Sequence, residues 1–243
     1  MRYSGRSKIT IRSAHLRDLD QLVRVEKASW EAACDPSDMY TEETFRGHID
    51  RAPDLFCVAE RSGRVVGYVS ALRLGIPLGE ADDRITTWYA ATGDGSYSTH
   101  NPDGESIFGA SLAVVPEAGN QGVGIRLKER LCVRCIELGL PGILLGGRLP
   151  GMANYLSSHP GATPAEYFRV RRPDGKAYDS ELRFYERDLV EVRKLLPEYF
   201  SDSQSCNYGV LLVWRNPFYG KLPKPVAVLV FRFAWFLSHL KRK

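Results

Sequence analysis

Three glycines in six residues stand between an apolar run and a long amphipathic stretch: Gly119, Gly122 and Gly124. A loop in front of a helix leaves backbone N–H groups without partners, and the helix dipole adds partial positive charge at the same end. Glycine also removes the Cβ atoms that would keep a ligand away from the backbone. The chemistry expected here is the binding of a pyrophosphate by main-chain amides.

Several classes of protein use a glycine loop in this way, and the surrounding residues separate some of them. A Walker loop ends in Gly-Lys followed by Ser or Thr, which is absent here. A dinucleotide fold needs Gly-x-Gly-x-x-Gly after the first strand and an acidic residue about 20 positions later. This loop lies in the middle of the chain and lacks that acid. A coenzyme A site and a plain tight turn both fit, and the loop alone does not separate them.

The elements that would position this loop follow from hydrophobic spacing and from turn residues. Strands are predicted at residues 8–12, 55–60, 64–74, 106–115, 142–149, 182–188 and 208–214. Helices are predicted at residues 13–33, 41–50 and 122–139. Ser62-Gly63 would close a hairpin, Ser13 and Thr41 would begin helices, and Gly139 would end one.

Composition limits the class of protein and its partners. The 243 residues, 44% of them hydrophobic, suffice for one large domain or two small ones. A net charge of +4 suits a small anionic ligand and is too weak to indicate nucleic acid. Five scattered cysteines do not form a disulfide framework, and the first residues show no signal-peptide core, so a cytoplasmic location is expected. Cys132 and Cys135 lack a second pair, so we expect packing there and no metal.

The order of elements and the stretch "VVPEAGNQGVGIRLKERL" resemble the GNAT acetyltransferase superfamily. The motif of that family is a strand end, a proline, Arg/Gln-x-x-Gly-x-Gly/Ala and a later leucine. It is matched by Pro116, Gly122, Gly124 and Leu127. Gly119 stands at the Arg/Gln position, which removes one side-chain contact and leaves the main-chain amides in place. Over roughly residues 8–217 the chain is similar to GNAT domains joined to nitrilase-like carbon–nitrogen hydrolases.

The resemblance implies an α/β fold of GNAT type with acetyl-CoA as co-substrate. A mixed, twisted central sheet of about seven strands would carry helices on both faces, and one strand pair would splay apart at the coenzyme A site. The acyltransferase domain would span residues 1–220, followed by a tail at 221–243. The residues expected to bind the donor are Leu112, Ala113 and Val114 for the pantetheine arm, and Asn120, Gln121, Gly122, Val123, Gly124 and Ile125 for the pyrophosphate.

Acyl transfer to an amine needs a base, a polarised carbonyl and a proton for the leaving thiolate. The backbone N–H near Val114 would polarise the carbonyl. Tyr155 follows the next predicted strand and is the expected acid, although a half-buried aromatic anchor fits it too. Glu105 is the expected base, ahead of Asp103 and His100, and each of the three also fits an ordinary loop residue.

Three further features bear on the acceptor and on partners. Residues 76–104 carry four aspartates, Trp88, Tyr89 and Tyr97, which favours an acceptor lid over a solvated loop. Arg148 would either face the acyl or acceptor pocket or pair with a nearby acid. Residues 226–237 are nearly all apolar yet too short to span a bilayer. A membrane surface or a second subunit is therefore expected to cover the tail, in preference to a groove on its own domain.

The sequence thus predicts an N-acyltransferase that moves an acetyl group from acetyl-CoA to a primary amine by direct attack. The acceptor would be a small molecule or a peptide. One alternative is a membrane-associated transferase with a longer acyl donor, carried on coenzyme A or on an acyl carrier protein. Another is a module that binds acyl-CoA without catalysis.

Overall fold

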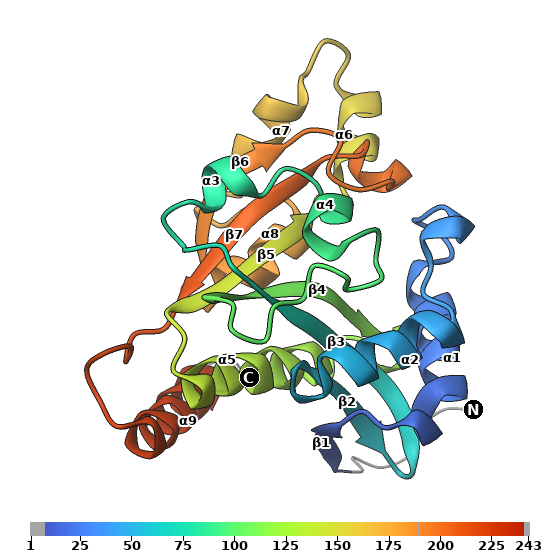
Figure 1. Cartoon of the computed structure of the whole chain (residues 1–243). Coiled ribbons are helices and arrows are strands. Elements are labelled where there is room, and N and C mark those ends of the chain that lie inside the picture. The colour runs from blue at the N-terminus through green and yellow to red at the C-terminus, as the bar shows by residue number, and fades with distance from the viewer. Residues whose placement is uncertain (1–7, 189, 241–243) are drawn as a thin grey trace.

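The computed structural model describes residues 8–188 and 190–240 and contains one seven-stranded mixed sheet in the order β1-β2-β3-β4-β5-β7-β6 (Figure 1). Only β4 and β5 run parallel; every other neighbouring pair is antiparallel. The strands are β1 Ile9–Ser13, β2 Phe56–Arg61, β3 Arg64–Leu74, β4 Ser106–Val114, β5 Gly142–Arg148, β6 Glu191–Leu196 and β7 Gly209–Arg215. The α/β GNAT-type sheet predicted from the sequence is confirmed.

Helices cover both faces of this sheet (Figure 1). The α-helices are α1 Leu19–Trp30, α2 Glu42–Arg51, α3 Ala81–Arg84, α4 Trp88–Thr92, α5 Val123–Leu138, α6 Met152–Ser158, α7 Pro164–Arg169, α8 Ser180–Glu186 and α9 Lys224–Leu240. Both α1 and α5 pack on β3 and β4, from opposite sides. The site described below therefore lies in the middle of the sheet, between these two helices.

Local turn chemistry explains several of the observed boundaries. Ser62 and Gly63 both have positive φ, of 49° and 76°, which is the geometry of a tight turn matched to hairpin twist. Thr41 accepts a hydrogen bond from the Thr44 amide at 3.2 Å and begins α2, as predicted. Gly139 ends α5 with φ of 73°, also as predicted.

Two sequence predictions about elements are wrong. Ser13 is the last residue of β1, not a helix cap, because the carboxylate of Asp18 organises the turn that precedes α1. The stretch 182–188 was expected as a strand, but α8 runs through it from 180 to 186. Asp179 explains this helix, because its side chain accepts from the amides of Glu181 and Leu182 at 2.9 and 3.1 Å.

A membrane surface or a subunit is expected to cover the tail in preference to its own domain, and the structure shows that one face of the tail does pack on the domain. Helix α9 lies along α5 at one side of the molecule. Its buried side chains are one turn apart, at Ala227, Phe231 and Trp235, and Phe231 meets Trp214 of β7 edge to face. Side chains at this helical spacing form one apolar face of α9, and that face is buried against the domain.

Candidate active site

The central feature of the site is the separation of β4 from β5. The two strands pair over only three residues of β4, Ile107 to Gly109, and then diverge (Figure 1). The divergence coincides with a β-bulge, because Ser70 pairs with Ser111 while Ala71 pairs with Gly109. Ala110 is the extra residue, and its carbonyl accepts from Trp88 Nε1 at 3.0 Å. A splayed strand pair is thus present.

The second half of β4 therefore has peptide groups that no neighbouring strand uses. The Val115 amide donates to the Val66 carbonyl at 3.0 Å, on the β3 side. Because peptide groups alternate along an antiparallel pair, those of Leu112 and Val114 point the other way, toward the gap left by β5. An extended ligand chain lying in this gap could pair with β4 as an added strand.

The glycine loop follows directly and leads into α5. Within the described part of the chain, no carbonyl or side chain accepts a hydrogen bond from the six consecutive amides of residues 120–125. Gly122 adopts φ of 79°, a left-handed conformation natural to glycine, and Asn120 also has positive φ. These amides lie at the N-terminus of a 16-residue helix, where an anion is favoured.

Side chains around the loop tie it to neighbouring strands. Gln121 accepts from Arg61 of β2 at 2.6 Å and donates to the Glu117 carbonyl at 2.7 Å. Arg126 donates to the Ile9 carbonyl of β1 at 2.7 Å. The backbone, and not these side chains, is the phosphate-binding element that the geometry offers.

A cavity of about 90 Å³ opens between the splayed strands. Its β4 wall consists of residues 109–112, so Leu112 is the one predicted donor-binding residue that lines it. Apolar side chains from α5, β5 and β7 form the floor, among them Leu131, Ile143 and Trp214. A cavity of roughly 150 Å³ accommodates benzene, so the smaller cavity here fits a short acyl group.

A buried carboxylate that was not predicted from the sequence lines this cavity. Glu26 of α1 is 5% exposed and lines the wall. One carboxylate oxygen accepts from the Tyr40 amide at 3.0 Å, and the other accepts from the Tyr68 hydroxyl. The Tyr68 hydroxyl in turn lies 3.0 Å from Ser111 Oγ, at the splay of β4.

Burial raises the pKa of Glu26 to about 7, even though the hydrogen bonds from Tyr40 and Tyr68 favour the charged form. A carboxylate whose pKa lies near neutrality is suited to accept and return a proton. The chain of three polar groups, Glu26, Tyr68 and Ser111, connects that carboxylate to the strand where the ligand gap begins.

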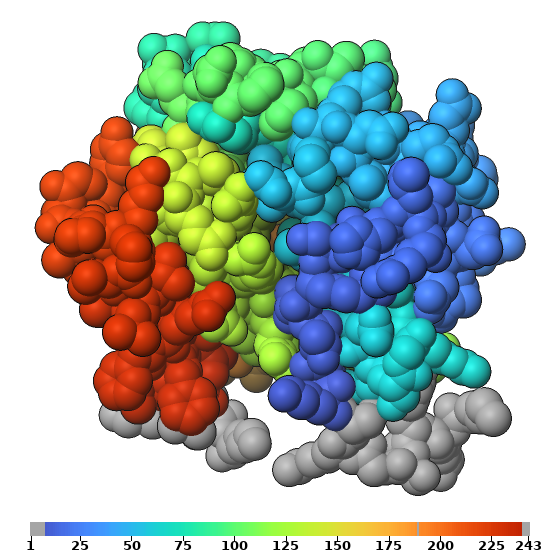
Figure 2. Space-filling view, turned by 60° about the horizontal axis from the view of Figure 1, so that its bottom comes forward, coloured from blue at the N-terminus to red at the C-terminus, as the bar shows by residue number. Residues whose placement is uncertain are grey.

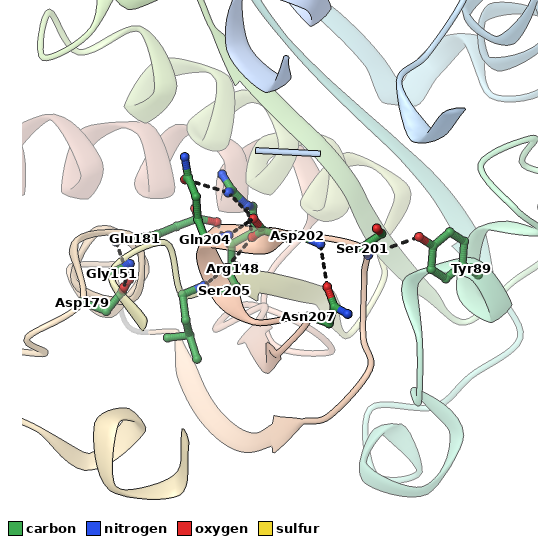
Figure 3. A network of polar contacts seen from close by, with 11 residues as sticks. Tyr89, Arg148, Gly151, Asp179, Glu181, Ser201, Asp202, Gln204, Ser205 and Asn207 are labelled. Carbon is green, nitrogen blue, oxygen red and sulfur yellow. Dashed lines mark hydrogen bonds and ion pairs between the residues drawn. The ribbon is translucent and has the colours of Figure 1, made fainter. Parts of the chain in front are cut away.

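Arg148 of β5 also lines the cavity, as the centre of a polar network (Figure 3). Its guanidinium pairs in a forked arrangement with Asp202, at 2.8 and 3.0 Å, and also donates to Gln204 at 3.1 Å. The Arg148 amide donates to Glu181 at 3.0 Å. Arg148 is therefore paired with an acid, which is one of the two alternatives expected, and it also lines the cavity.

A buried ion pair closes the floor of the cavity. Lys128 of α5 lies 2.5 Å from Asp188, and both side chains are almost fully buried. The ammonium group also sits 3.8 Å from the centre of the Phe184 ring. His239 of α9 lies 3.3 Å from the same carboxylate, so the C-terminal helix and the cavity floor share one acidic group.

The structure does not bring the two predicted catalytic side chains to this cavity. Tyr155 of α6 stacks on His159 with ring centres 4.0 Å apart and packs against Tyr167 and Tyr178. Glu105 is exposed before the start of β4, at the end opposite the glycine loop. Neither residue lines the cavity.

Residues 76–104 contribute only Trp88 to the cavity lining, which differs from the expected acidic lid. Trp88 lines the cavity, whereas Tyr97 is buried and stacks on His48 at 3.6 Å. Asp82 pairs with Arg193 at 2.5 Å, and no aspartate of this segment lines the cavity. The described ranges also hold no group of three or more His, Cys, Asp or Glu side chains placed to bind a metal.

Comparisons with known proteins agree with this geometry. The model of the acetyltransferase (GNAT) family matches residues 19–154, more than half of the chain. The chain therefore belongs to the GNAT acetyltransferase family.

Individual relatives share most of the chain. It is 27% identical over 213 residues to the "Uncharacterized N-acetyltransferase YkwB" of Bacillus subtilis, which covers 88% of this chain and 91% of that protein. It is 30% identical to "Probable hydrolase YhcX" of the same organism over 86% of this chain, but spans only 39% of that protein. The solved structure of the GphF GNAT-like decarboxylase in complex with isobutyryl-CoA has a TM-score of 0.69 at 21% identity, over 85% of this chain and 98% of that one.

Proposed function

We propose that the protein transfers a short acyl group, acetyl in the simplest case, from acyl-CoA to an amine. The observation that carries this proposal is the continuity of the site. Six amides at the start of α5 donate to no described residue, and they are followed by peptide groups of β4 that face away from β3 and then by a small, mostly apolar cavity. A pyrophosphate, a pantetheine arm and an acyl group are arranged in the same order along a coenzyme A thioester.

The donor site in this proposal uses backbone throughout. The amides of residues 120–125 hold the pyrophosphate, and the peptide groups of Leu112 and Val114 pair with the arm. The acyl group then enters the cavity beside residues 109–112. Its volume of about 90 Å³ favours a short chain over the longer acyl donor considered from the sequence.

Glu26 is the proposed general base. An incoming ammonium must lose a proton before its nitrogen attacks the thioester carbonyl, and a carboxylate with a pKa near 7 accepts that proton at neutral pH. Tyr68 and Ser111 then offer a path by which a proton reaches the departing thiolate. An amide of β4, at Leu112 or Val114, polarises the carbonyl.

The charges that line the cavity near Glu26 support an amine as the acceptor. Glu26 and Asp38 both line the cavity, and Asp38 accepts from the Tyr89 hydroxyl at 2.8 Å. The cavity cations Arg148 and Lys128 are each paired with an aspartate. The side of the cavity beside α1 is thus acidic, which favours a cationic amine over an anion.

The direct test is calorimetry of the whole chain with acetyl-, isobutyryl-, malonyl- and octanoyl-CoA, followed by thiol release with a panel of amines. We expect binding of the short thioesters, weak binding of octanoyl-CoA, and thiol release only when an amine is present. Malonyl-CoA is included because one solved neighbour is a decarboxylase. Release of CO₂ from it without an amine would replace our proposal with decarboxylation, and no heat with any thioester would end it.

The glycine loop gives a prediction about donor affinity. Gly122→Val places a β-branched residue at φ of 79°, where non-glycine residues cost about 1–2 kcal/mol. The loop then shifts out of the conformation that presents the amides. We expect the Kd for acetyl-CoA to rise about tenfold or more, measured by calorimetry.

A matched control is available at Gly175, which has φ of 78° and equally open space for a Cβ. It lies in the turn between α7 and α8, away from the glycine loop. Gly175→Val should show similar strain in thermal unfolding with an unchanged Kd. Equal effects of both substitutions on Kd would rule out the loop as the donor site.

Substitution of Tyr155 tests whether this residue is the general acid expected from the sequence or a packed side chain, as its contacts indicate. Because its ring is packed among His159, Tyr167 and Tyr178, we expect Tyr155→Phe to keep kcat within about twofold. Loss of a general acid costs about 10²–10⁴-fold. Steady-state kinetics at saturating acetyl-CoA decides, and a drop of that size would restore Tyr155 as the acid.

A further inference from the structure

Helix α9 presents an uncovered apolar face. Its exposed large side chains recur with helical spacing: Val226, Leu229, Val230, Phe233, Phe236 and Leu237, which are 42–71% exposed. At 3.6 residues per turn this stripe lies opposite the buried positions Ala227, Phe231 and Trp235. Figure 2 shows the helix, in red, as a ridge at the edge of the molecule. Scattered apolar residues need no explanation, but a continuous stripe of this kind marks an interaction surface.

The segment that carries this stripe has charged side chains of one sign only. Residues 217–243 contain no aspartate or glutamate and six lysines or arginines: Lys221, Lys224, Arg232, Lys241, Arg242 and Lys243. The last three lie outside the described residues. A helix with exposed phenylalanine and leucine, flanked by cations alone, matches the chemistry of an anionic lipid surface.

Two other ways of burying the exposed stripe of α9 fit the structure less well. The part of the chain that the structure describes has no helix long and apolar enough to cross a bilayer, so α9 would have to lie in the plane of the surface. A second copy of α9 would bring two segments without any acidic side chain against each other. Neither segment would supply an acidic side chain to offset the repulsion between their cations.

We propose that α9 docks the protein on anionic membranes, with its outer stripe inserted among the headgroups and its inner stripe kept on α5. Two contacts fix the inner stripe. Lys224 Nζ donates to the Leu138 carbonyl at 3.1 Å, at the end of α5, and His239 lies beside Asp188. The helix thus needs no rearrangement to present its apolar face. This proposal is independent of the acyltransferase activity.

The test is sedimentation of the full chain with vesicles of phosphatidylcholine alone or mixed equally with phosphatidylglycerol. We expect binding to the mixed vesicles only, weakened by high salt because screening reduces the attraction. The double variant L229E/F233E should bind at least about tenfold more weakly. A matched variant, S157E/A165E, adds the same charge at exposed positions on α6 and α7 and should bind as the parent does.

Circular dichroism and thermal unfolding show whether each variant remains folded, and sedimentation velocity gives the oligomeric state. Equal binding by L229E/F233E and by the parent would overturn the proposal. A dimer that L229E/F233E dissociates, without vesicle binding by the parent, would overturn it in favour of a second copy. Absence of binding to mixed vesicles by a monomeric parent would overturn it outright.

Discussion

Replacing Glu26 with glutamine is expected to lower kcat about 10²–10⁴-fold while the Kd for acetyl-CoA stays unchanged. The carboxylate lines the acyl cavity and is the proposed acceptor of the amine proton, and loss of a general base has an effect of this size. Glutamine keeps the shape and can still hydrogen-bond Tyr40 and Tyr68. Parallel calorimetry and steady-state kinetics separate donor binding from turnover.

The pH profile gives a second readout for the same substitution. Because the pKa of Glu26 is raised to about 7 by burial, the parent should gain kcat/KM as the pH rises through 7. The residual activity of Glu26→Gln should lack that rise. Glu181→Gln is the matched control, since Glu181 lines the same cavity on the wall beside Arg148. An equal loss in both variants would mean that any change of charge in the cavity abolishes turnover.

Stability should change in the opposite direction to activity. The pKa of Glu26 is raised from 4.5 in an ordinary environment to about 7 in the fold, so its contribution to stability is complete below pH 4.5 and is lost as the pH rises through 7. The shift corresponds to about 3 kcal/mol. Glu26→Gln should therefore have a higher free energy of unfolding than the parent at pH 8, and this gain should shrink toward pH 5.

Removing one partner of the Lys128–Asp188 pair should produce the largest loss of stability. Asp188→Asn leaves a buried ammonium, whose pKa burial already lowers, without its counter-charge. Breaking a buried pair costs about 3–5 kcal/mol, a large part of the total stability of a domain of about 5–15 kcal/mol. Urea unfolding at pH 7 measures the change.

The reason for this loss can be tested with a double replacement. Lys128→Met with Asp188→Leu removes both charges and should recover most of the stability, since apolar pairs often replace buried ion pairs without loss. Glu31→Gln is the control for a surface pair, because Lys27 and Glu31 are both more than 60% exposed. It should change the free energy of unfolding by less than about 0.5 kcal/mol. A small effect of Asp188→Asn would show that the cavity floor is open to water.

The sequence predicts the glycine loop and its surroundings well because those features are local. Turn residues such as Ser62-Gly63 and Gly139 need only their own backbone conformation to act, and the structure has both turns. The apolar runs of β2 to β5 can likewise be recognised as strands from the spacing of hydrophobic residues within a few positions. The match to a GNAT sheet follows from this local pattern and its order along the chain.

The base and the tail depend on contacts distant in sequence, which a local pattern does not contain. Tyr68 donates a hydrogen bond from its hydroxyl to Glu26, and the two residues are 42 positions apart in the sequence. One signal was available, because Glu26 occupies an inward position of α1 together with Leu19, Leu22 and Val25. A charged residue on an apolar helical face has to be explained by burial or by function. For α9, the sequence shows an apolar helix but not that α5 supplies a surface for one side of it.

The bulge in β4 determines on which face of the sheet each side chain of this strand lies. Gly109 pairs with Ala71 and faces Leu131 of α5, whereas Ser111 pairs with Ser70 and points to the same side as Tyr68. In an unbroken strand, positions two apart share a side. Because Ala110 is an inserted residue, Gly109 and Ser111 lie on opposite sides. The Ser111 hydroxyl therefore lies on the side of Tyr68 and Glu26, and Gly109 lies on the side of the apolar residues of α5. A strand that kept all three residues in regular pairing would instead turn Gly109 and Ser111 to the same side of the sheet.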